Sequence, residues 1–319
     1  MLCHMKILFI DTVHEHLSSH LTRMDFECVD GSLLSRHEIL GIIGEYEGVV
    51  IRSRIKLDKE FLDKATSLRF IARAGSGLEN IDVDYAKMLG IKCLNAPEGN
   101  KDAVAEHAMG MLLTLFNHIN TADSEVRNGI WKREENRGVE LLGRTVGIIG
   151  YGNTGQALAK RMGGFGVLMY AYDKFKKGFG DSLVVETNME SIFQEAEVLT
   201  LHVPLTEETH HLLDDKFFEK LKNPIYLINT SRGPVVDTEA LAWAIESGKV
   251  LGACLDVLEV EKFNFEQLEN QEIPEALQYL LDSDKVIFSP HIAGWTMESN
   301  AKIAHVLAEK IQKEFSMVH

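Results

Sequence analysis

Cysteine is scarce in this 319-residue sequence. The four cysteines are Cys3, Cys28, Cys93 and Cys254, and no two of them form a C-x-x-C pair. Widely spaced cysteines in a chain of this length are typical of free thiols in a reducing compartment, and they argue against a disulfide framework or a zinc site. We therefore expect a cytoplasmic protein without a metal centre.

Positive charge is also in short supply. The sequence has 33 lysines and arginines against 48 aspartates and glutamates, which gives a net charge of −15. So acidic a surface repels phosphate backbones and anionic lipids, and this argues against nucleic acid or membrane as a partner. A local basic pocket for a small anion is still compatible with this charge.

Long apolar runs are missing as well. No run approaches the roughly 18–20 residues that cross a bilayer. The first residues, MLCHMKILFID, contain too short an apolar stretch for a signal peptide. Because the first expected strand begins at Lys6, Met5 is an alternative start to Met1.

Short β-branched runs that alternate with stretches of helical pattern make up most of the chain. This β-α-β-α order predicts an α/β protein with parallel sheets covered by helices on both faces. The length suggests two domains, at roughly 100–200 residues per domain. The expected strands are Lys6–Ile10, Phe26–Asp30, Gly48–Arg52, Arg69–Ala74, Ile91–Asn95, Thr145–Gly150, Leu168–Asp173, Val198–Val203, Ile225–Asn229, Gly252–Asp256 and Val286–Ser289.

A glycine-rich turn, Gly150-Tyr151-Gly152-Asn153-Thr154-Gly155, lies between an expected strand and an expected helix. In this pattern the glycines permit a tight turn, close approach of a pyrophosphate and close helix packing, while the helix N-terminus attracts negative charge. The next strand ends in Asp173, where a carboxylate can accept from a ribose 2′-hydroxyl and repel a 2′-phosphate. The motif favours NAD over NADP, although a glycine-rich turn without a ligand is the alternative.

Three further strand ends carry candidate catalytic side chains. Arg232 follows one strand, where a guanidinium can grip a carboxylate through two hydrogen bonds. Carboxylates including Glu259 and Glu261 follow the next strand, and His291 follows the last. Histidine is the natural acid and base near neutral pH, and an adjacent carboxylate would stabilise its charged form. Four other histidines are interpreted as structural or exposed: His107, His202, His210 and His211.

These motifs, in this order and spacing, resemble the D-2-hydroxyacid dehydrogenase family over essentially the whole chain, and within it the members that act on 3-phospho-D-glycerate. The matching segments are RAGSGLENID at 73–82, NAPEGNKDAVAEHA at 95–108, GRTVGIIGYGNTG at 143–155, HVPLTEET at 202–209, INTSRGPVVDTEAL at 228–241, GACLDVLEVE at 252–261 and SPHIAGWT at 289–296.

The resemblance implies a role for each matching position. Arg232 would bind the substrate carboxylate and polarise the C2 oxygen, and His291 would be the general acid and base. Glu261 would pair with His291, a role that it takes instead of Glu259 because it lies five residues after Asp256. The cofactor would be NAD, bound by Ser76, Gly150, Gly152, Asn153, Thr154, Gly155, Asp173, Val203, Thr230, Asp256 (to the nicotinamide carboxamide) and Gly294. Substrate would be bound by Arg52, Ser53, Arg73, Ser76, Gly77 and Arg133.

The resemblance also implies two doubly wound, Rossmann-like α/β domains with the active-site cleft between them. Residues 1–98 and 293–319 would form the substrate domain, and residues 99–292 the NAD-binding domain. A helix from about Lys101 to Asn117 is rich in small residues, which allow close approach of another backbone. In the family this helix contributes to a dimer, so we expect a homodimer through the NAD-binding domain.

Arg52, Arg73 and Arg133 match positions that bind the substrate phosphate in the phosphoglycerate-specific members, although each taken alone could be a solvated surface arginine. Three departures keep a smaller substrate open. Lys262 and Phe263 stand where a proline is usual, the stretch from Glu261 to His291 is long, and Trp295 is bulky.

Two alternatives therefore remain beside oxidation of 3-phospho-D-glycerate for serine synthesis. One is a reductase of glyoxylate, hydroxypyruvate or pyruvate, the last of these being the D-lactate reaction. The other is a non-catalytic, NAD-sensing interaction protein like the corepressors of this fold, since a fold alone does not prove chemistry. The presence of Arg232, Glu261 and His291 together favours an enzyme.

Overall fold

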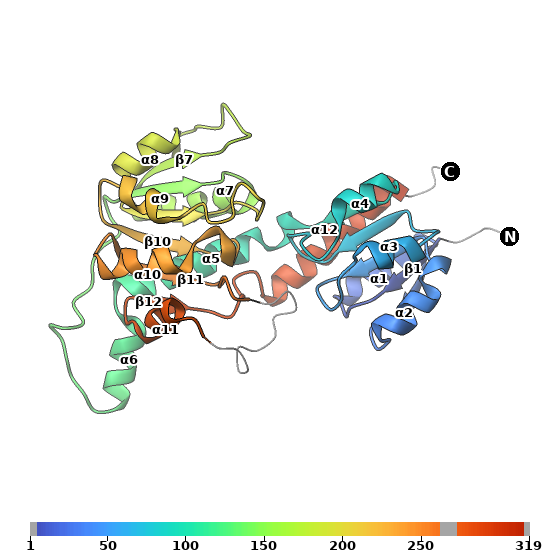
Figure 1. The fold of residues 1–319 in the computed structure, drawn as a ribbon, viewed down its shortest axis with the longest axis horizontal. Coiled ribbons are helices and arrows are strands. Elements are labelled where there is room, and N and C mark those ends of the chain that lie inside the picture. The colour runs from blue at the N-terminus through green and yellow to red at the C-terminus, as the bar shows by residue number, and fades with distance from the viewer. Residues whose placement is uncertain (1–4, 262–272, 316–319) are drawn as a thin grey trace. The chain divides into compact units, whose positions relative to one another are not determined.

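A computed structural model describes residues 5–261 and 273–315 of the chain (Figure 1). Met1, Cys3, Lys262 and Phe263, named above, lie outside the described residues. The chain divides into two compact units, one formed by residues 1–101 and 295–319 and the other by residues 102–294. We call them unit 1 and unit 2, and each is described by itself.

Unit 1 is built on a five-stranded parallel sheet of order β2-β1-β3-β4-β5. Its strands are β1 (Lys6–Phe9), β2 (Glu27–Asp30), β3 (Gly48–Ile51), β4 (Phe70–Arg73) and β5 (Lys92–Asn95). Its helices are α1 (Glu15–Thr22), α2 (Arg36–Ile42), η1 (Ile43–Glu45), α3 (Lys59–Lys64), α4 (Val83–Met88) and α12 (Met297–Phe315). Helix α5 (Pro97–Phe116) begins in unit 1 and continues into unit 2.

Alternation along the strands of unit 1 divides its core into two layers. Leu8, Val49 and Ile71 face the cluster that includes α2, α3 and α4, whereas Ile7 and Val50 face the cluster that includes α1 and α12. Successive residues of a strand point to opposite faces, so a sheet buried on both faces needs an unbroken apolar run. The sequence GVVI of β3, which is buried throughout, is such a run.

Unit 2 is built on a seven-stranded parallel sheet of order β12-β11-β10-β9-β6-β7-β8. Its strands are β6 (Thr145–Ile149), β7 (Leu168–Tyr172), β8 (Val184–Glu186), β9 (Val198–Leu201), β10 (Ile225–Asn229), β11 (Val250–Leu255) and β12 (Val286–Phe288). Its helices are α6 (Ile119–Arg127), α7 (Asn153–Met162), η2 (Gly163–Phe165), α8 (Met189–Glu195), α9 (Asp215–Lys220), η3 (Gly233–Val235), α10 (Thr238–Glu246) and α11 (Glu275–Asp282).

The strand order of unit 2 reverses direction between β6 and β9. Such a reversal leaves a crevice at the carboxyl ends of the two strands, where open α/β sheets bind ligands. The expected fold class, two doubly wound parallel sheets, is confirmed for each unit. Strand β8 was not expected from the sequence, because it has only three residues and pairs only with β7 at the edge of the sheet.

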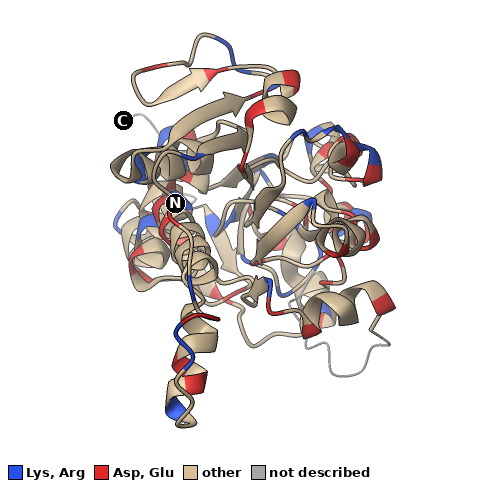
Figure 2. Cartoon of the chain, turned by 90° about the vertical axis from the view of Figure 1, so that its left-hand side faces the viewer, with Lys and Arg blue, Asp and Glu red and all other residues tan. Residues whose placement is uncertain are grey.

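Acidic and basic residues are interspersed along the helices and loops (Figure 2). Over residues 5–261 and 273–315, none of the helices combines the length and apolar character that crossing a membrane requires. Nor does that part of the chain contain a group of three or more histidine, cysteine, aspartate or glutamate side chains arranged to hold a metal ion.

Candidate active site

The glycine-rich turn joins β6 to α7 at the switch point of the unit 2 sheet. Gly150 has φ of +93°, and a Cβ on it would lie 2.5 Å from the carbonyl oxygen of His202. A Cβ on Gly155 would lie 2.3 Å from the carbonyl oxygen of Gly150. A side chain at either position would therefore break the turn, whereas a Cβ on Gly152 meets no protein atom within 4 Å. The turn is therefore packed against protein atoms at Gly150 and Gly155, whereas the space beside Gly152 is open.

Gly152, at the open side of this turn, is also the N-cap of helix α7, an end that can receive an anion. Helix α7 begins at Asn153, and its N-cap, Gly152, has no side chain to accept from the N–H groups of the first turn. Its first backbone N–H groups and its dipole are therefore available to a phosphate. Val203, which follows β9, lies beside the turn, since its Cγ1 would be 3.1 Å from a Cβ on Gly150.

Asp173 follows β7 and connects it to the glycine-rich turn. Its Oδ2 accepts from the Tyr151 backbone N–H at 2.9 Å, and its Oδ1 accepts from Phe175 and Lys176 at 2.9 and 3.0 Å. Burial acts to raise the pKa of this carboxyl, but these backbone hydrogen bonds outweigh it and hold the pKa below its ordinary value. An ionised carboxylate therefore lies at the end of β7, bonded to the glycine-rich turn.

Arg232 lies in the loop between β10 and η3. The loop is held by Asn229, whose Oδ1 accepts from the Ser231 backbone and hydroxyl at 3.0 and 2.7 Å and whose Nδ2 donates to the Arg232 carbonyl at 3.1 Å. Beside it, the buried hydroxyl oxygen of Thr230 has no hydrogen-bond partner within the described residues. A polar ligand atom at this edge of the sheet would satisfy that hydroxyl.

Glu261 and His291 form a hydrogen-bonded pair. The Oε2 of Glu261 lies 2.7 Å from the Nδ1 of His291, and its Oε1 accepts from the Leu258 backbone N–H at 2.5 Å. A carboxylate on Nδ1 fixes the orientation of the ring and stabilises the imidazolium, and Nε2 is then the nitrogen for proton exchange with a substrate. His291 also has φ of +55°, a left-handed conformation that is uncommon for residues other than glycine.

Asp256 holds the turn that presents His291. Its carboxylate is buried and accepts from the Ser289 hydroxyl at 2.6 Å and from the backbone N–H groups of Ile292 and Ala293, both at 2.9 Å. Its own carbonyl accepts from the His291 N–H at 2.8 Å. Sequence reasoning assigned Asp256 to a nicotinamide carboxamide. In the structure its contacts are with the turn and with His107, whose Nε2 lies 3.6 Å away. Sequence reasoning missed Ser289 in this role because a lone serine gives no signal.

The carboxylate that neighbours the pair, Glu259, does not face His291. Its Oε1 lies 2.6 Å from the Nε2 of His211. The structure therefore distinguishes the two glutamates that the sequence offered, and it places Glu261 at His291.

The substrate candidates of unit 1 lie at the end of β4 and in the loops that follow β3 and β4. The backbone N–H groups of Arg52 and Ser53 donate to the Oδ2 of Asp11 at 2.6 and 3.1 Å. Arg54 lies 3.4 Å from Asp11 and donates to the carbonyls of Ile10 and Leu34. Sequence reasoning missed this Asp11–Arg54 support, although an aspartate directly after the first expected strand was a readable signal.

Arg52 and Arg73 are held by well-defined contacts. The Arg52 guanidinium lies 4.2 Å from the ring centroid of Trp295, and its carbonyl accepts from the Nε of Arg73 at 3.2 Å. The Arg73 guanidinium crosses Gly75, since a Cβ there would lie 1.7 Å from its Nη1. The following Ser76 donates to the Oδ1 of Asn100 at 2.6 Å.

The remaining candidates are distributed over both units. Gly77 lies in the same unit 1 loop as Ser76, and Gly294 ends unit 2. Arg133 is exposed in the segment between α6 and β6. Unit 2 thus contains Arg232, Glu261, His291 and Arg133 together with every dinucleotide candidate except Ser76, whereas Arg52, Ser53, Arg73, Ser76 and Gly77 belong to unit 1.

We predict that the buried ring of His202, which lies beneath the glycine-rich turn, makes the folded chain less stable in acid. Its ring contacts the Thr200 hydroxyl at 3.0 Å, and burial lowers its pKa from 6.5 to about 4. As the pH falls below 6.5, His202 binds a proton in the unfolded chain but stays neutral in the folded chain. The free energy of unfolding therefore decreases as the pH falls from 6.5 towards 4. Between pH 7.5 and pH 5 we expect the free energy of unfolding to fall by about 2 kcal/mol more in the wild type than in His202→Gln. Urea unfolding at the two pH values measures this difference. Parallel pH dependences would contradict this.

Comparisons with known proteins identify the family of this chain. Residues 109–293 match the family described as "D-isomer specific 2-hydroxyacid dehydrogenase, NAD binding domain". The chain is 40% identical to a hydroxypyruvate reductase of Thermotoga maritima over 284 residues, 89% of this chain and 90% of the relative. It is 36% identical to a D-3-phosphoglycerate dehydrogenase of Archaeoglobus fulgidus over 96% of this chain, which spans only 56% of that relative. A structure of D-lactate dehydrogenase from Aquifex aeolicus with NAD and lactic acid matches with a TM-score of 0.78, at 29% identity over 96% of this chain and 94% of that one.

Proposed function

Because this chain belongs to the D-isomer specific 2-hydroxyacid dehydrogenase family, we propose that Arg232, Glu261 and His291 catalyse its NAD-dependent reaction, with 3-phospho-D-glycerate as the substrate. The product would be 3-phosphohydroxypyruvate, a precursor for serine. The observation that carries the proposal is the Glu261–His291 pair at 2.7 Å, presented by the strand ends of a dinucleotide-type sheet.

NAD, when bound, supplies the chemistry by taking a hydride from C2 of a hydroxy acid or, in the reduced form, giving it back. The residues present fit this cofactor. Gly150, Gly152 and the N-terminus of α7 would receive the pyrophosphate, and Asp173 would accept from the adenosine ribose. The unsatisfied Thr230 hydroxyl would take a further polar atom of the dinucleotide.

The protein residues then control binding and the proton. The Arg232 guanidinium binds the 2-oxo acid carboxylate and polarises the C2 oxygen, which stabilises negative charge that develops on that oxygen. His291 donates a proton to this oxygen during reduction and removes it during oxidation. Glu261 stabilises the imidazolium and keeps Nδ1 occupied, so that the proton is transferred at Nε2.

The choice of a phosphorylated substrate rests on the arginines. Arg52 follows β3 and Arg73 ends the adjacent β4, and two guanidinium groups at neighbouring strand ends suit a doubly charged phosphate. Arg133 is assigned to the same phosphate. The second candidate is hydroxypyruvate, the same acid without the phosphate. Two observations favour it: the Thermotoga maritima relative has that activity in its name, and Trp295 covers one face of Arg52.

A substrate panel tests the proposal. Oxidation of NADH would be followed with phosphohydroxypyruvate, hydroxypyruvate, glyoxylate and pyruvate, with NADPH as a parallel donor. We expect the highest kcat/KM with phosphohydroxypyruvate. A preference for an unphosphorylated acid would retain the reaction and overturn the substrate. Binding of NADH without turnover of any of the four would favour the interaction-protein alternative.

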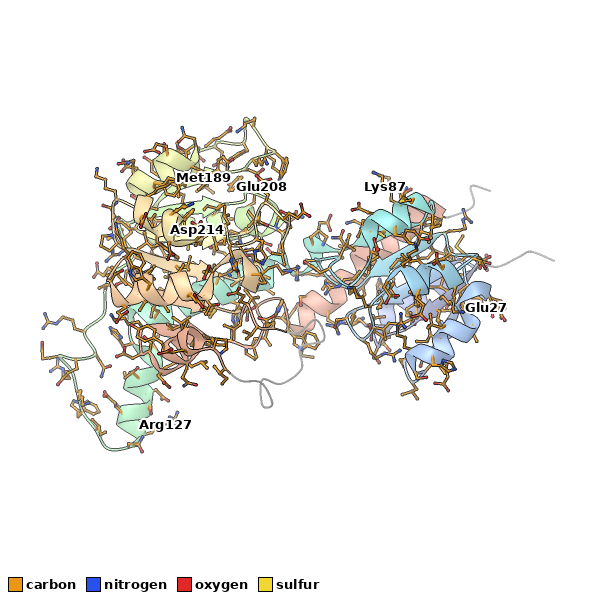
Figure 3. The ribbon with its side chains drawn as sticks, viewed as in Figure 1. Glu27, Lys87, Arg127, Met189, Glu208 and Asp214 are labelled. Atoms are coloured by element: carbon orange, nitrogen blue, oxygen red, sulfur yellow. The ribbon has the colours of Figure 1, made fainter. Side chains whose placement is uncertain are left out.

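Cofactor preference has a second determinant beside Asp173. Lys174, which could otherwise attract a 2′-phosphate, is ion-paired with Glu208, labelled in Figure 3. Glu208→Gln should release this lysine and raise the ratio of kcat/KM for NADPH over NADH. Exposed pairs are weak, so we expect about a 2- to 5-fold rise. Glu207→Gln is the matched control, and an equal rise in both variants would contradict the assignment.

We also assign a second copy of the chain as the partner, through unit 2. None of the residues of α6 is buried, and Figure 3 labels Arg127 at its end. Large apolar side chains are exposed on α6 and after it, including Val126, Trp131 and Leu142 at 52%, 77% and 69%. A surface of this kind is covered in a stable oligomer. Light scattering should give twice the chain mass of 35.8 kDa, and Trp131→Lys should lower it towards one chain. A monomeric wild type would exclude this assignment.

A cytoplasmic location belongs to the same proposal. Cys28, Cys93 and Cys254 are all free thiols in the structure, as expected of a protein in a reducing compartment.

A further inference from the structure

A second carboxylate–imidazole pair lies two residues from Glu261. The Oε1 of Glu259 is 2.6 Å from the Nε2 of His211, and the two side chains are 28% and 33% exposed. The other oxygen of Glu259 accepts from the Thr238 backbone N–H at 3.0 Å and from the Thr238 hydroxyl at 2.6 Å. None of these atoms takes part in the proposed reaction. Even so, both oxygens of the Glu259 carboxylate have hydrogen-bond partners.

The contacts of Glu259 connect three segments of unit 2. Glu259 lies in the turn after β11, Thr238 is the first residue of α10, and His211 lies in the segment that precedes α9. The Nδ1 of His211 is 3.4 Å from Asp237, the N-cap of α10, whose side chain accepts from two backbone N–H groups of that helix. His211 itself has φ of +49° and donates its backbone N–H to the Pro234 carbonyl at 2.8 Å.

These segments are the ones that carry the catalytic candidates. A Cβ on Gly233, the residue after Arg232, would lie 1.9 Å from the Leu258 carbonyl oxygen and 2.5 Å from the Glu259 nitrogen. The Arg232 loop is therefore in direct backbone contact with the turn after β11. In the same turn the Leu258 N–H donates to Glu261, whose other oxygen meets His291. The position of this turn thus sets both the Arg232 loop and the Glu261–His291 pair.

Ionised Glu259 is well suited to connect these segments through hydrogen bonds. Burial acts to raise its pKa, but hydrogen bonds from Thr238 and His211 outweigh burial and hold the pKa below its ordinary value. Glu259 is therefore an acceptor for both partners at neutral pH. Hydrogen bonds to a charged group are stronger than those between neutral groups.

We propose that Glu259, supported by His211, is a positioning residue that holds the turn between Arg232 and the Glu261–His291 pair. This inference rests on the proposed function, because it concerns the same catalytic residues. Glu259 does not touch the reacting atoms. Its loss should lower kcat by misplacing groups that must be set to within a fraction of an ångström, and should leave binding of NADH in place.

Two substitutions at Glu259 separate geometry from charge. Glu259→Ala removes every contact. Glu259→Gln keeps an oxygen that accepts from Thr238, and its amide can donate to the Nε2 of His211 once that ring carries its proton on Nδ1, towards Asp237. The glutamine therefore preserves the hydrogen bonds to Thr238 and His211 without the negative charge. His211→Gln is a second route to the same site if Glu259→Ala does not fold.

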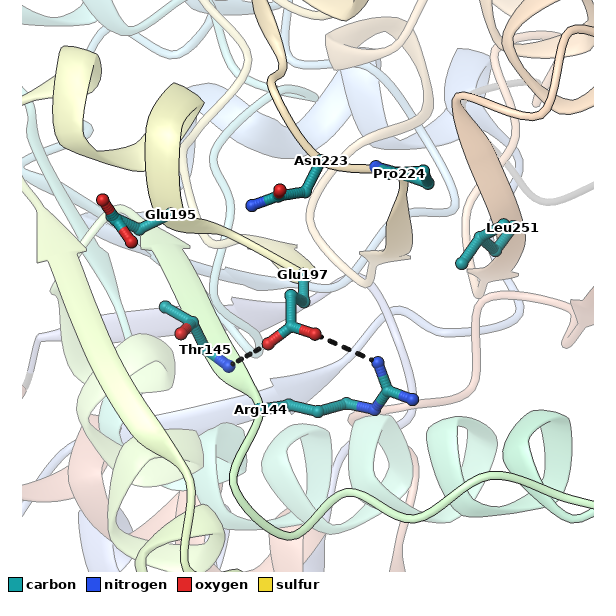
Figure 4. Close-up of a pocket in the computed structure, with 7 residues that line it drawn as sticks. All are labelled: Arg144, Thr145, Glu195, Glu197, Asn223, Pro224 and Leu251. Atoms are coloured by element: carbon teal, nitrogen blue, oxygen red, sulfur yellow. Dashed lines mark hydrogen bonds and ion pairs between the residues drawn. The ribbon is translucent and has the colours of Figure 1, made fainter.

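The matched control lies at the opposite end of the same sheet. Glu197 lines a shallow pocket at the amino ends of the strands, together with Arg144, Thr145 and Asn223 (Figure 4). Like Glu259 it accepts from a backbone N–H and from a side chain, at 2.9 Å from Thr145 and 3.3 Å from Arg144. Its side chain is 36% exposed. Glu197→Ala therefore removes a comparable structural carboxylate far along the strands from the catalytic candidates.

Four variants and the wild type would be compared by kcat, KM, NADH affinity and melting temperature, on whichever panel acid the wild type reduces best. We expect Glu259→Ala to lower kcat by about 10- to 100-fold, with changes below about 3-fold in KM and in NADH affinity. Glu259→Gln should recover to within about 3-fold of the wild type, and His211→Gln should lie between the two. Glu197→Ala should lower the melting temperature and keep kcat.

A readout that does not need turnover completes the test. The Nδ1–H proton of His291, hydrogen-bonded to Glu261, should give a downfield proton resonance that disappears in His291→Asn. We expect this resonance to shift or broaden in Glu259→Ala and to stay unchanged in Glu197→Ala. An unchanged resonance in Glu259→Ala, a kcat within about 2-fold of the wild type, or a Glu259→Gln as impaired as Glu259→Ala would each overturn the positioning role. A wild type without turnover would overturn the proposed reaction instead, and the resonance would still decide the role of Glu259.

Discussion

Replacement of His291 by asparagine should reduce kcat by about 10²- to 10⁴-fold, the usual contribution of a positioned acid or base. Asparagine is the suitable replacement for two reasons. It tolerates the left-handed backbone that His291 adopts at φ of +55°, and its amide can still donate to Glu261. The loss would therefore report on the missing proton and not on a disturbed turn. Steady-state NADH oxidation with the preferred acid measures it.

The control separates chemistry from folding and binding. NADH affinity, measured by quenching of protein fluorescence, should stay within about 3-fold of the wild type, because the dinucleotide candidates other than Gly294 do not follow the strand that carries His291. His37→Asn, an exposed histidine of α2, should have normal kcat. If His291→Asn kept more than about a tenth of the wild-type kcat, His291 would have no acid–base role.

Replacement of Arg52 by glutamine should lower kcat/KM for phosphohydroxypyruvate by about 100-fold, and far less for hydroxypyruvate. Arg52 is half-buried beneath Trp295, and burial lowers the pKa of its guanidinium, although Asp11 acts in the opposite direction. A cation held in so restricted a place can form strong hydrogen bonds to a phosphate, worth about 1.5–3 kcal/mol each. Glutamine retains a planar group against Trp295 but removes the charge.

The informative quantity is the ratio of the two kcat/KM values, because it cancels changes in enzyme concentration or general fold. Arg36→Gln serves as the control. Arg36 also belongs to unit 1 but is paired with Asp58 and Glu60 at the surface, and its loss should leave the ratio as it is. If Arg52→Gln lowered kcat/KM equally for both acids, Arg52 would not be the residue that binds the phosphate. Hydroxypyruvate would then be favoured as the substrate.

The fold class could be predicted from the sequence because its signals are local. Buried parallel strands require continuous apolar runs, and the runs around Val49, Ile148 and Ile228 identify three of them directly. The glycine-rich turn is equally local, since positive φ at Gly150 and close contact at Gly155 allow no other residue. Strand β8 escaped prediction because three residues at a sheet edge are too few for a period to be recognised.

The partners of individual side chains could not be predicted in the same way. Glu259 and Glu261 follow the same strand and differ in sequence only by their distance from Asp256. The resemblance predicted that Glu261 meets His291, and the structure confirms that contact, whereas only the folded chain shows that Glu259 meets His211. Asp256 illustrates the same point, since its hydrogen bonds run to residues more than 30 positions away.

The sequence by itself determined the class of fold, the dinucleotide motif and the residue types needed for hydride and proton transfer, because turn geometry and strand patterning depend on neighbours along the chain. The resemblance already paired Glu261 with His291, but tertiary structure alone decided that Glu259 meets His211 and Thr238. It also decided that Arg52 stacks on Trp295, 243 positions along the chain. Those contacts join segments that only the parallel sheets and the packing of α12 bring together, so no local pattern could encode them.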